Sequence, residues 1–324
     1  MKNKELTLGR AARWLRAAAA WAMAGVVVAL AACQTAPLPP PACLPEAVSP
    51  ALAAASAPPA PLPRPTRPPR VGLALGGGAS RGFAHIGVIQ VLEENGIHPD
   101  LVVGTSAGSL VAALYASGKN GHELAALALA MDESSITDWS FPGRGMIRGE
   151  ALARYIRDNT QSMSFEQAKL PLGIVATDLD SGDSMLFRRG DVGTAVRASS
   201  AVPSVFQPVR IGSREYVDGG LVSPVPVLYA RHMGAELVIA VDISSPPEGS
   251  VPADTLDILM QTFSIMSKSI NRYELRDADV VVRPALLGIA SADFSSRKRA
   301  IEAGRQAMLL ALPLLRSAID SKTR

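Results

Sequence analysis

Short apolar segments alternate with helical patterns from Val71 to the C-terminus of the chain. The apolar segments are aliphatic and bounded by turn residues, which is typical of buried strands. They cover residues 71–75, 101–103, 172–176, 184–188, 237–241 and 280–283. Helical periodicity covers residues 82–95, 107–117, 121–131, 149–159, 194–199, 224–233, 256–276 and 297–319. This order of elements predicts an α/β fold with a mostly parallel central sheet.

One folded domain accounts for the whole of this pattern. Residues 71–324 contain no internal repeat and no second Pro-rich linker. Their length lies within the usual range for a single α/β domain. We therefore predict one domain over residues 71–324.

The N-terminus has a different pattern, in which a basic segment precedes an apolar run from Ala17 to Cys33. The run is shorter than the roughly 20 residues of a membrane-spanning helix, as is typical of a secretion signal. Its end, Leu-Ala-Ala-Cys, resembles the lipobox of bacterial lipoproteins, in which the cysteine is lipidated after cleavage. We predict a signal peptide over residues 1–32 and membrane attachment through Cys33, with an uncleaved signal anchor as the alternative. Gln34 in place of aspartate favours the outer membrane of a double-membraned bacterium.

Residues 33–70 are dominated by proline and alanine and show no periodic apolar face. Proline disfavours both helix and sheet pairing, so we predict an extended tether with polyproline character. A ligand for a proline-binding domain is the alternative.

The formal charge of +3 comes from the N-terminal segment and does not describe the predicted domain. Five of the 32 basic residues and one of the 29 acidic residues lie in residues 1–32, so the remainder of the chain is close to neutral. No basic stripe is left, which argues against nucleic-acid binding. We also find no metal-ligand cluster and no calcium-loop pattern, and we expect no cofactor.

The segment Gly104-Thr105-Ser106-Ala107-Gly108 fits the pattern GxSxG. A predicted strand precedes it and a predicted helix follows, which is the context of a nucleophile elbow. The sharp turn crowds its neighbours, so Gly104 and Gly108 flank an exposed Ser106. An ordinary tight turn between a strand and a helix is the alternative.

A second glycine-rich turn lies in Leu73–Gly87, "LALGGGASRGFAHIG". Consecutive backbone N–H groups at a helix start bind anions. Neither nucleotide fingerprint fits, because Arg81 occupies the third glycine position of GxGxxG and the Walker pattern is absent. An oxyanion hole needs only N–H groups, which Gly77 and Gly78 can supply beside the positive charge of Arg81.

A third motif, Asp218-Gly219-Gly220, is read either as a common turn or as the source of a catalytic base. Of the four histidines, only His232 follows Asp218, and nothing near it in the sequence supports a Ser-Asp-His triad. Direct action of Asp218 on Ser106 is the simpler arrangement.

Together these motifs resemble the bacterial patatin-like phospholipases, acyl hydrolases with a Ser-Asp dyad, over about residues 71–243. The matching segments are "GGGASRG", "GTSAG", "RASSAVPSVFQPV" (197–209) and "VDGG", with a weaker match in "DFSSRKRAIEAGRQA". The resemblance implies a three-layer α/β/α patatin-like fold, Ser106 as nucleophile and Asp218 as base. It implies an oxyanion loop of Gly76, Gly77, Gly78 and Arg81. Ala79 departs from the family, many members of which have a fourth glycine, and this bears on loop geometry.

The implied activity is hydrolysis of carboxylic esters of lipids or phospholipids, in lipid catabolism or membrane remodelling. An acyltransferase or thioesterase with the same dyad is one alternative, and a non-catalytic lipid-binding envelope lipoprotein is another. We interpret residues 134–152, which lack a clear period, as a candidate lid. The Met- and Phe-rich segment 256–270 is expected to pack in the core, with contact to acyl chains as the alternative.

Overall fold

The computed structural model of the chain describes residues 67–140, 144–244, 254–289 and 293–324. The predicted signal peptide, Cys33 and residues 33–66 of the predicted tether lie outside the described residues.

An eight-stranded sheet with the order β10-β9-β1-β2-β4-β8-β7 forms the centre of the fold, and β5 pairs with β4 beside this path. Neighbours from β10 to β4 are parallel, whereas β5, β8 and β7 pair antiparallel. The strands are β1 (Val71–Leu75), β2 (Leu101–Thr105), β4 (Leu172–Asp178), β5 (Ser184–Phe187), β7 (Val209–Ile211), β8 (Arg214–Asp218), β9 (Leu237–Val241) and β10 (Val280–Val282). The predicted mostly parallel sheet is therefore confirmed, with antiparallel strands on both edges of β4.

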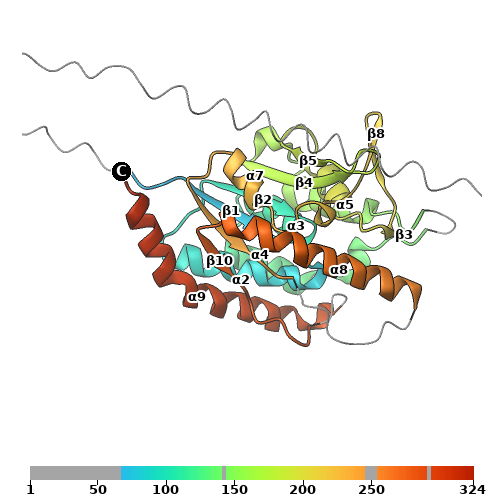
Figure 1. Cartoon of the computed structure of the whole chain (residues 1–324). Helices are drawn as coiled ribbons and strands as arrows, with labels where there is room; N and C mark the ends of the chain where they lie inside the picture. Colours follow the sequence, from blue (N-terminus) through green and yellow to red (C-terminus); the bar gives the residue numbers. More distant parts are fainter. Residues whose placement is uncertain (1–66, 141–143, 245–253, 290–292) are drawn as a thin grey trace, which may run out of the picture. The chain divides into compact units, whose positions relative to one another are not determined.

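Helices cover both faces of this sheet (Figure 1). Along β9, Leu237 and Ile239 pack in the larger apolar cluster, whereas Val238 and Ala240 pack in a second cluster on the opposite face. Successive residues of a strand point to opposite faces, so a strand buried on both sides reads as a continuous apolar run. The elements on the larger cluster's side are α2 (Phe83–Glu94), α3 (Ala107–Ala116), α4 (Gly121–Ala130), α5 (Glu150–Thr160), α6 (Val192–Ser199) and α9 (Arg297–Lys322). The short helix α7 (Val227–His232) covers the other face.

Four strands lie outside the predicted ranges, namely β8 and three strands of only three residues each. Two of them, β3 (Gly145–Ile147) and β6 (Ser204–Phe206), pair in parallel as a separate small sheet. The third, β7, forms a hairpin with β8. Strands of three residues carry too little alternation to be distinguished from loops by period.

Helix α8 (Thr255–Glu274) differs from its prediction as a core helix. Asn271 is its one buried residue, and the side chains of Ile258, Ile265 and Met266 are 56%, 53% and 45% exposed. Apolar composition by itself cannot tell a core helix from a surface one, so the prediction was wrong. Within the described residues, no helix is both long and apolar enough to cross a membrane.

Candidate active site

Ser106 occupies a strained turn between β2 and α3. Its φ of 52° and ψ of −124° lie outside the regions that L-residues favour. A Cβ atom on Gly108 would lie 2.1 Å from the carbonyl oxygen of Leu75, and one on Gly104 would lie 2.4 Å from the carbonyl oxygen of Gly108. The backbone approach at this elbow therefore requires glycine on both sides of Ser106, as the motif predicts.

The hydroxyl of Ser106 and the carboxylate of Asp218 are in direct contact. Ser106 Oγ donates a hydrogen bond of 2.7 Å to Asp218 Oδ2, and Gly220 N donates one of 2.7 Å to Asp218 Oδ1. The backbone of Asp218 is also fixed, because its N–H donates to Ala201 O and its carbonyl accepts from Thr177 Oγ1. These hydrogen bonds fix both the backbone and the carboxylate of Asp218, so that Oδ2 faces Ser106.

Strand β4 explains how residues so distant in the chain meet. Its residues 172–175 pair with β2 and its residues 176–178 pair with β8, whereas β5 pairs with residues 174–177 along the other edge. Strands β2 and β8 therefore follow one another along the same edge of β4, with Val175 opposite Thr105 and Ala176 opposite Asp218. Thr105, which precedes Ser106, and Asp218, the last residue of β8, are therefore opposite consecutive positions of one strand. This alignment places Ser106 and Asp218 next to each other along β4.

Burial changes the acidity of the Asp218 carboxyl. Its side chain is 3% exposed, and loss of hydration raises its pKa to about 6, although the hydrogen bonds from Ser106 and Gly220 favour the charged form. A carboxyl with this pKa is ionised at neutral pH and is more basic than an aspartate in water. It has the properties of a general base.

The glycine loop supplies fewer free amides than the sequence suggests. Gly76 N donates to Val241 O at 3.1 Å, and Gly77 N donates to Pro224 O at 2.9 Å. These N–H groups hold the loop to its neighbours, which corrects the expectation that they face an oxyanion. For Gly78 N, the described residues offer no acceptor, so this amide is available to a ligand. The loop still lies against the nucleophile, since a Cβ on Gly77 would be 3.2 Å from Ser106 Cβ.

Arg81 and Ala79 shape this loop. Arg81 donates from both its N–H and its Nε to the carbonyl of Gly78, at 3.2 and 3.3 Å. Ala79, which departs from the expected glycine, adopts a left-handed φ of 51°. Alanine reaches this region at a cost of roughly 1–2 kcal/mol, so this residue strains the loop.

Ser199 was not singled out by the sequence, although it lies within the "RASSAVPS" segment. It is fully buried at the end of α6, where its Oγ accepts a hydrogen bond of 2.8 Å from Ser106 N and donates one to Val175 O. On the other side of the elbow, Thr105 Oγ1 donates to Ser223 O at 2.8 Å. These hydroxyls fix the backbone on which the nucleophile stands, and only the fold brings them there.

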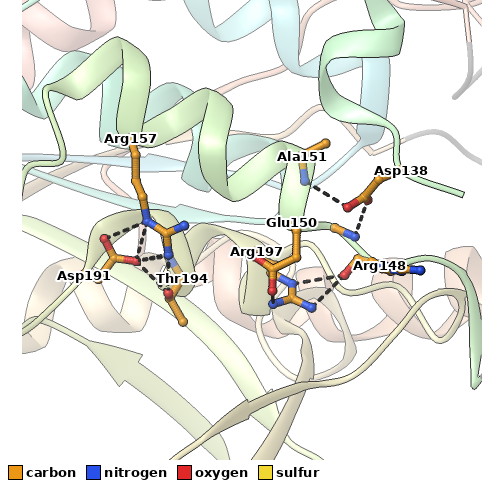
Figure 2. Close-up of polar contacts among 9 residues, drawn as sticks. Asp138, Arg148, Glu150, Ala151, Arg157, Asp191, Thr194 and Arg197 are labelled. Atoms are coloured by element: carbon orange, nitrogen blue, oxygen red, sulfur yellow. Dashed lines mark hydrogen bonds and ion pairs between the residues drawn. The ribbon is translucent and has the colours of Figure 1, made fainter. Parts of the chain in front are cut away.

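Polar contacts hold α6 against α5, as Figure 2 shows. Arg157 of α5 forms an ion pair of 2.7 Å with Asp191, the residue that caps α6. Arg197 of α6 pairs with Glu150 and donates to Arg148 O. The network fixes the helix whose last residue, Ser199, supports the elbow.

An apolar cavity of about 360 Å³ adjoins the nucleophile. Ser106 and Ala107 lie at one part of its wall, and aliphatic and aromatic side chains form most of the remainder. Members of that lining include Phe83, Leu110, Leu114, Leu124, Ala128 and Phe206. A cavity of this kind accepts a hydrocarbon chain and excludes water from the dyad.

The candidate lid contains regular structure in the described residues. A short helix, Glu133–Ile136, precedes β3, and α5 begins at Glu150. Ile136, Trp139 and Ile147 line the apolar cavity. Residues 141–143 lie outside the described part, so the prediction of a moving lid stays a prediction.

The described contacts place no histidine on Ser106 or Asp218. His85 is fully buried, and its Nε2 donates to Gly76 O at 2.8 Å; burial lowers its pKa to about 4. His232 ends α7, where its ring packs edge-on against Tyr229. The described residues also contain no group of three or more His, Cys, Asp or Glu residues placed to hold a metal ion.

Comparison with known proteins finds a match in the part of the chain that carries this site. Residues 73–231 match the patatin-like phospholipase family. The matched residues include Ser106 and Asp218. The fold agrees, because the crystal structure of VipD from Legionella pneumophila has a TM-score of 0.55 at 15% identity, covering 76% of this chain and 67% of that chain. The predicted patatin-like three-layer α/β/α fold is confirmed.

Proteins similar to this chain occur in bacteria and animals. An uncharacterised NTE family protein of Mycobacterium tuberculosis is 38% identical over 184 residues, which is 56% of this chain and 51% of the relative. Patatin-like phospholipase domain-containing protein 6 of Mus musculus is 34% identical over 186 residues, or 55% of this chain and 14% of that protein. The chain therefore spans about half the length, or less, of these relatives.

Proposed function

We propose that this protein hydrolyses carboxylic esters of lipids, with phospholipids as the substrate class, through Ser106 as nucleophile and Asp218 as base. The observation that carries the proposal is the 2.7 Å hydrogen bond between Ser106 Oγ and Asp218 Oδ2 beside an apolar cavity. A hydroxyl on a strained elbow, a buried base and a hydrocarbon-sized cavity fit acyl transfer from a lipid ester to water.

In the first half of the reaction, Ser106 Oγ bonds to the acyl carbon while its proton moves to Asp218 Oδ2. The carbonyl oxygen becomes an oxyanion, which the N–H of Gly78 and the first amide of α3, at Ala107, stabilise by hydrogen bonds. The C–O bond to the alcohol then breaks, and the alcohol leaves with the proton from Asp218. In the second half, water takes the place of the alcohol and releases the fatty acid.

The apolar cavity contributes to both halves of this reaction. The acyl chain enters it and displaces water, which keeps the carboxylate of Asp218 poorly solvated and basic. No metal or cofactor takes part in the proposed steps, because Asp218 moves the proton and the amides carry the charge.

We also propose that the protein acts as an envelope lipoprotein, anchored in the outer membrane of a double-membraned bacterium through Cys33. The proposal is supported by the basic N-terminus, the apolar run from Ala17 and the lipobox-like Leu-Ala-Ala-Cys. Residues 1–32 then act as a signal peptide, and residues 33–70 tether the domain of residues 71–324 to the membrane. Its role is lipid catabolism or membrane lipid remodelling.

Fluorophosphonate labelling combined with lipid product analysis tests the enzymatic proposal. We expect a covalent adduct at Ser106 in the wild-type protein and free fatty acid from phospholipid vesicles. Ser106→Ala and Asp218→Asn abolish turnover while circular dichroism stays unchanged, and Ser117→Ala, at the far end of α3, keeps full activity. An adduct at another residue, or fatty acid release by Ser106→Ala, would rule out the dyad. Acyl transfer to an added alcohol in preference to water would indicate the acyltransferase alternative.

A further inference from the structure

Helix α8 carries a stripe of exposed side chains that the proposed reaction does not use. Ile258, Ile265 and Arg272 follow one another at intervals of seven residues, so they lie on one side of the helix. The N-terminal part of the stripe is apolar, with Met266 adding to it. The C-terminal part is basic, with Lys268 and Arg272 exposed.

A hollow of about 530 Å³ lies beside the basic end of α8. Four cationic side chains line it, namely Lys268, Arg272, Arg276 and Arg283. Asp242 is the one acid in the lining, and it pairs with Arg283 at 3.4 Å. The hollow therefore has a clear excess of positive charge and fits a phosphate-bearing anion.

A buried amide in the wall of this hollow also has unused hydrogen-bonding capacity. Asn271 is 3% exposed, and neither its Nδ2 nor its Oδ1 has a hydrogen-bond partner in the part of the chain that the structure describes. Buried amides in folded proteins nearly always have partners. An anion in the hollow would supply an acceptor for Nδ2.

The hollow and Ser106 lie at the same end of the parallel strands, where their carboxyl ends meet. Asp242 follows β9, Arg283 follows β10, and Ser106 follows β2, and these strands are parallel through β1. Helix α8 is also attached to the turn of the catalytic carboxylate, since Ser267 Oγ donates to Gly220 O at 3.3 Å. A surface that binds α8 therefore lies near the end of the strands that carries Ser106.

We propose that α8 is the membrane-docking element of this domain and that its partner is a lipid surface with anionic phosphate headgroups. The apolar side chains of Ile258, Ile265 and Met266 enter the interfacial region of the bilayer. The basic hollow binds phosphate headgroups through Lys268 and Arg272. An apolar stripe continuous with cations matches the chemistry of such a surface, where both kinds of contact favour binding.

Site-specific fluorescence tests this proposal on the full chain. A cysteine replaces Ile265 and carries a polarity-sensitive fluorophore, and Cys33 and Cys43 are replaced by serine. We expect a blue shift of emission on vesicles of phosphatidylcholine with phosphatidylglycerol, and little shift on phosphatidylcholine alone. The same fluorophore at position 310, on the exposed side of α9, shows no shift on either vesicle.

Charge reversal isolates the role of the hollow. Lys268→Glu with Arg272→Glu is expected to weaken the vesicle partitioning measured at position 265 by about 30-fold. Matched reversal of Arg188 and Arg189, on the surface after β5, leaves it unchanged. Both double variants are expected to retain wild-type turnover of a water-soluble ester, and Ser106→Ala is expected to retain the blue shift. Loss of docking can therefore be told apart from loss of catalysis.

Three outcomes would overturn the proposal. One is an equal response to both kinds of vesicle, and another is no response to either. The third is a concentration-dependent shift without vesicles, which would identify this face as a contact between copies of the chain.

Discussion

Ser199 Oγ lies 2.8 Å from the backbone nitrogen of Ser106 and accepts its hydrogen bond, although 93 positions separate the two residues. The elbow is strained, and this buried hydroxyl holds it in place by bridging to β4 through Val175 O. Ser199 is a positioning residue, because it acts on the reaction through the backbone of Ser106.

Replacing Ser199 by alanine is therefore expected to lower kcat for a soluble ester and change KM little. A buried N–H that loses its acceptor costs about 1–3 kcal/mol, which corresponds to a decrease in kcat of about 5- to 160-fold. Ser117→Ala removes a hydroxyl from the other end of α3 and serves as the matched control. Unchanged kcat in Ser199→Ala would show that the strain of the elbow needs no such support.

The rate is expected to depend on pH through Asp218. Its pKa is raised to about 6 by burial, so the carboxylate base forms as pH increases through this value. We expect kcat/KM on a non-ionising ester to increase tenfold per pH unit below about pH 6 and to level off by about pH 8. A profile that is flat over this interval would exclude a buried carboxylate as the base.

Glu274 offers a second buried carboxyl, and its effect falls on stability. Burial raises its pKa to about 7, even though Ser223 Oγ donates to its Oε1. Because the folded pKa exceeds that of the unfolded chain, the folded state binds more protons between these two values, and stability decreases as pH increases from about 4.5 to about 7. Glu274→Gln, which carries no charge, is thus expected to raise the free energy of unfolding at pH 8 by up to about 3 kcal/mol.

The measurement is denaturant unfolding of wild type and Glu274→Gln at both ends of this interval. At about pH 4, where both side chains are neutral, the two proteins should have closely similar stability. A gain at low pH that equals the gain at high pH would show that packing, and not charge, causes the difference. The pH dependence of kcat/KM should be the same in both proteins, since Asp218 is unchanged.

The apolar cavity predicts a preference for the length of the acyl chain. Ala128 on α4 lines the cavity, and Ala128→Phe fills part of it. Each methylene group that can no longer be buried loses about 0.8 kcal/mol, so turnover of long-chain esters should decrease far more than that of butyrate esters. Ala126→Phe, at an exposed position on the same helix, serves as the control. Equal loss for short and long esters would place the acyl chain elsewhere.

The sequence determines the elements that carry the chemistry. Continuous aliphatic runs fix β1, β2, β4 and β9, because strands buried on both faces need no polar positions. The glycines beside Ser106 mark the elbow, since no other residue fits the approach of Leu75 O to position 108. Local pattern carries this information because each of these features depends on neighbours in the chain.

The tertiary structure decides which of these residues meet. Asp218 reaches Ser106 because β8 enters antiparallel beside β4, a pairing that the sequence pattern does not specify. The backbone amides of Gly76 and Gly77 donate to Val241 O and Pro224 O, which lie far away in sequence. Likewise, the apolar side chains of α8 are exposed because no element of the described residues packs over them. Each of these outcomes depends on contacts between distant segments. The periodicity of apolar residues shows which side chains are apolar, but it does not show which element covers them.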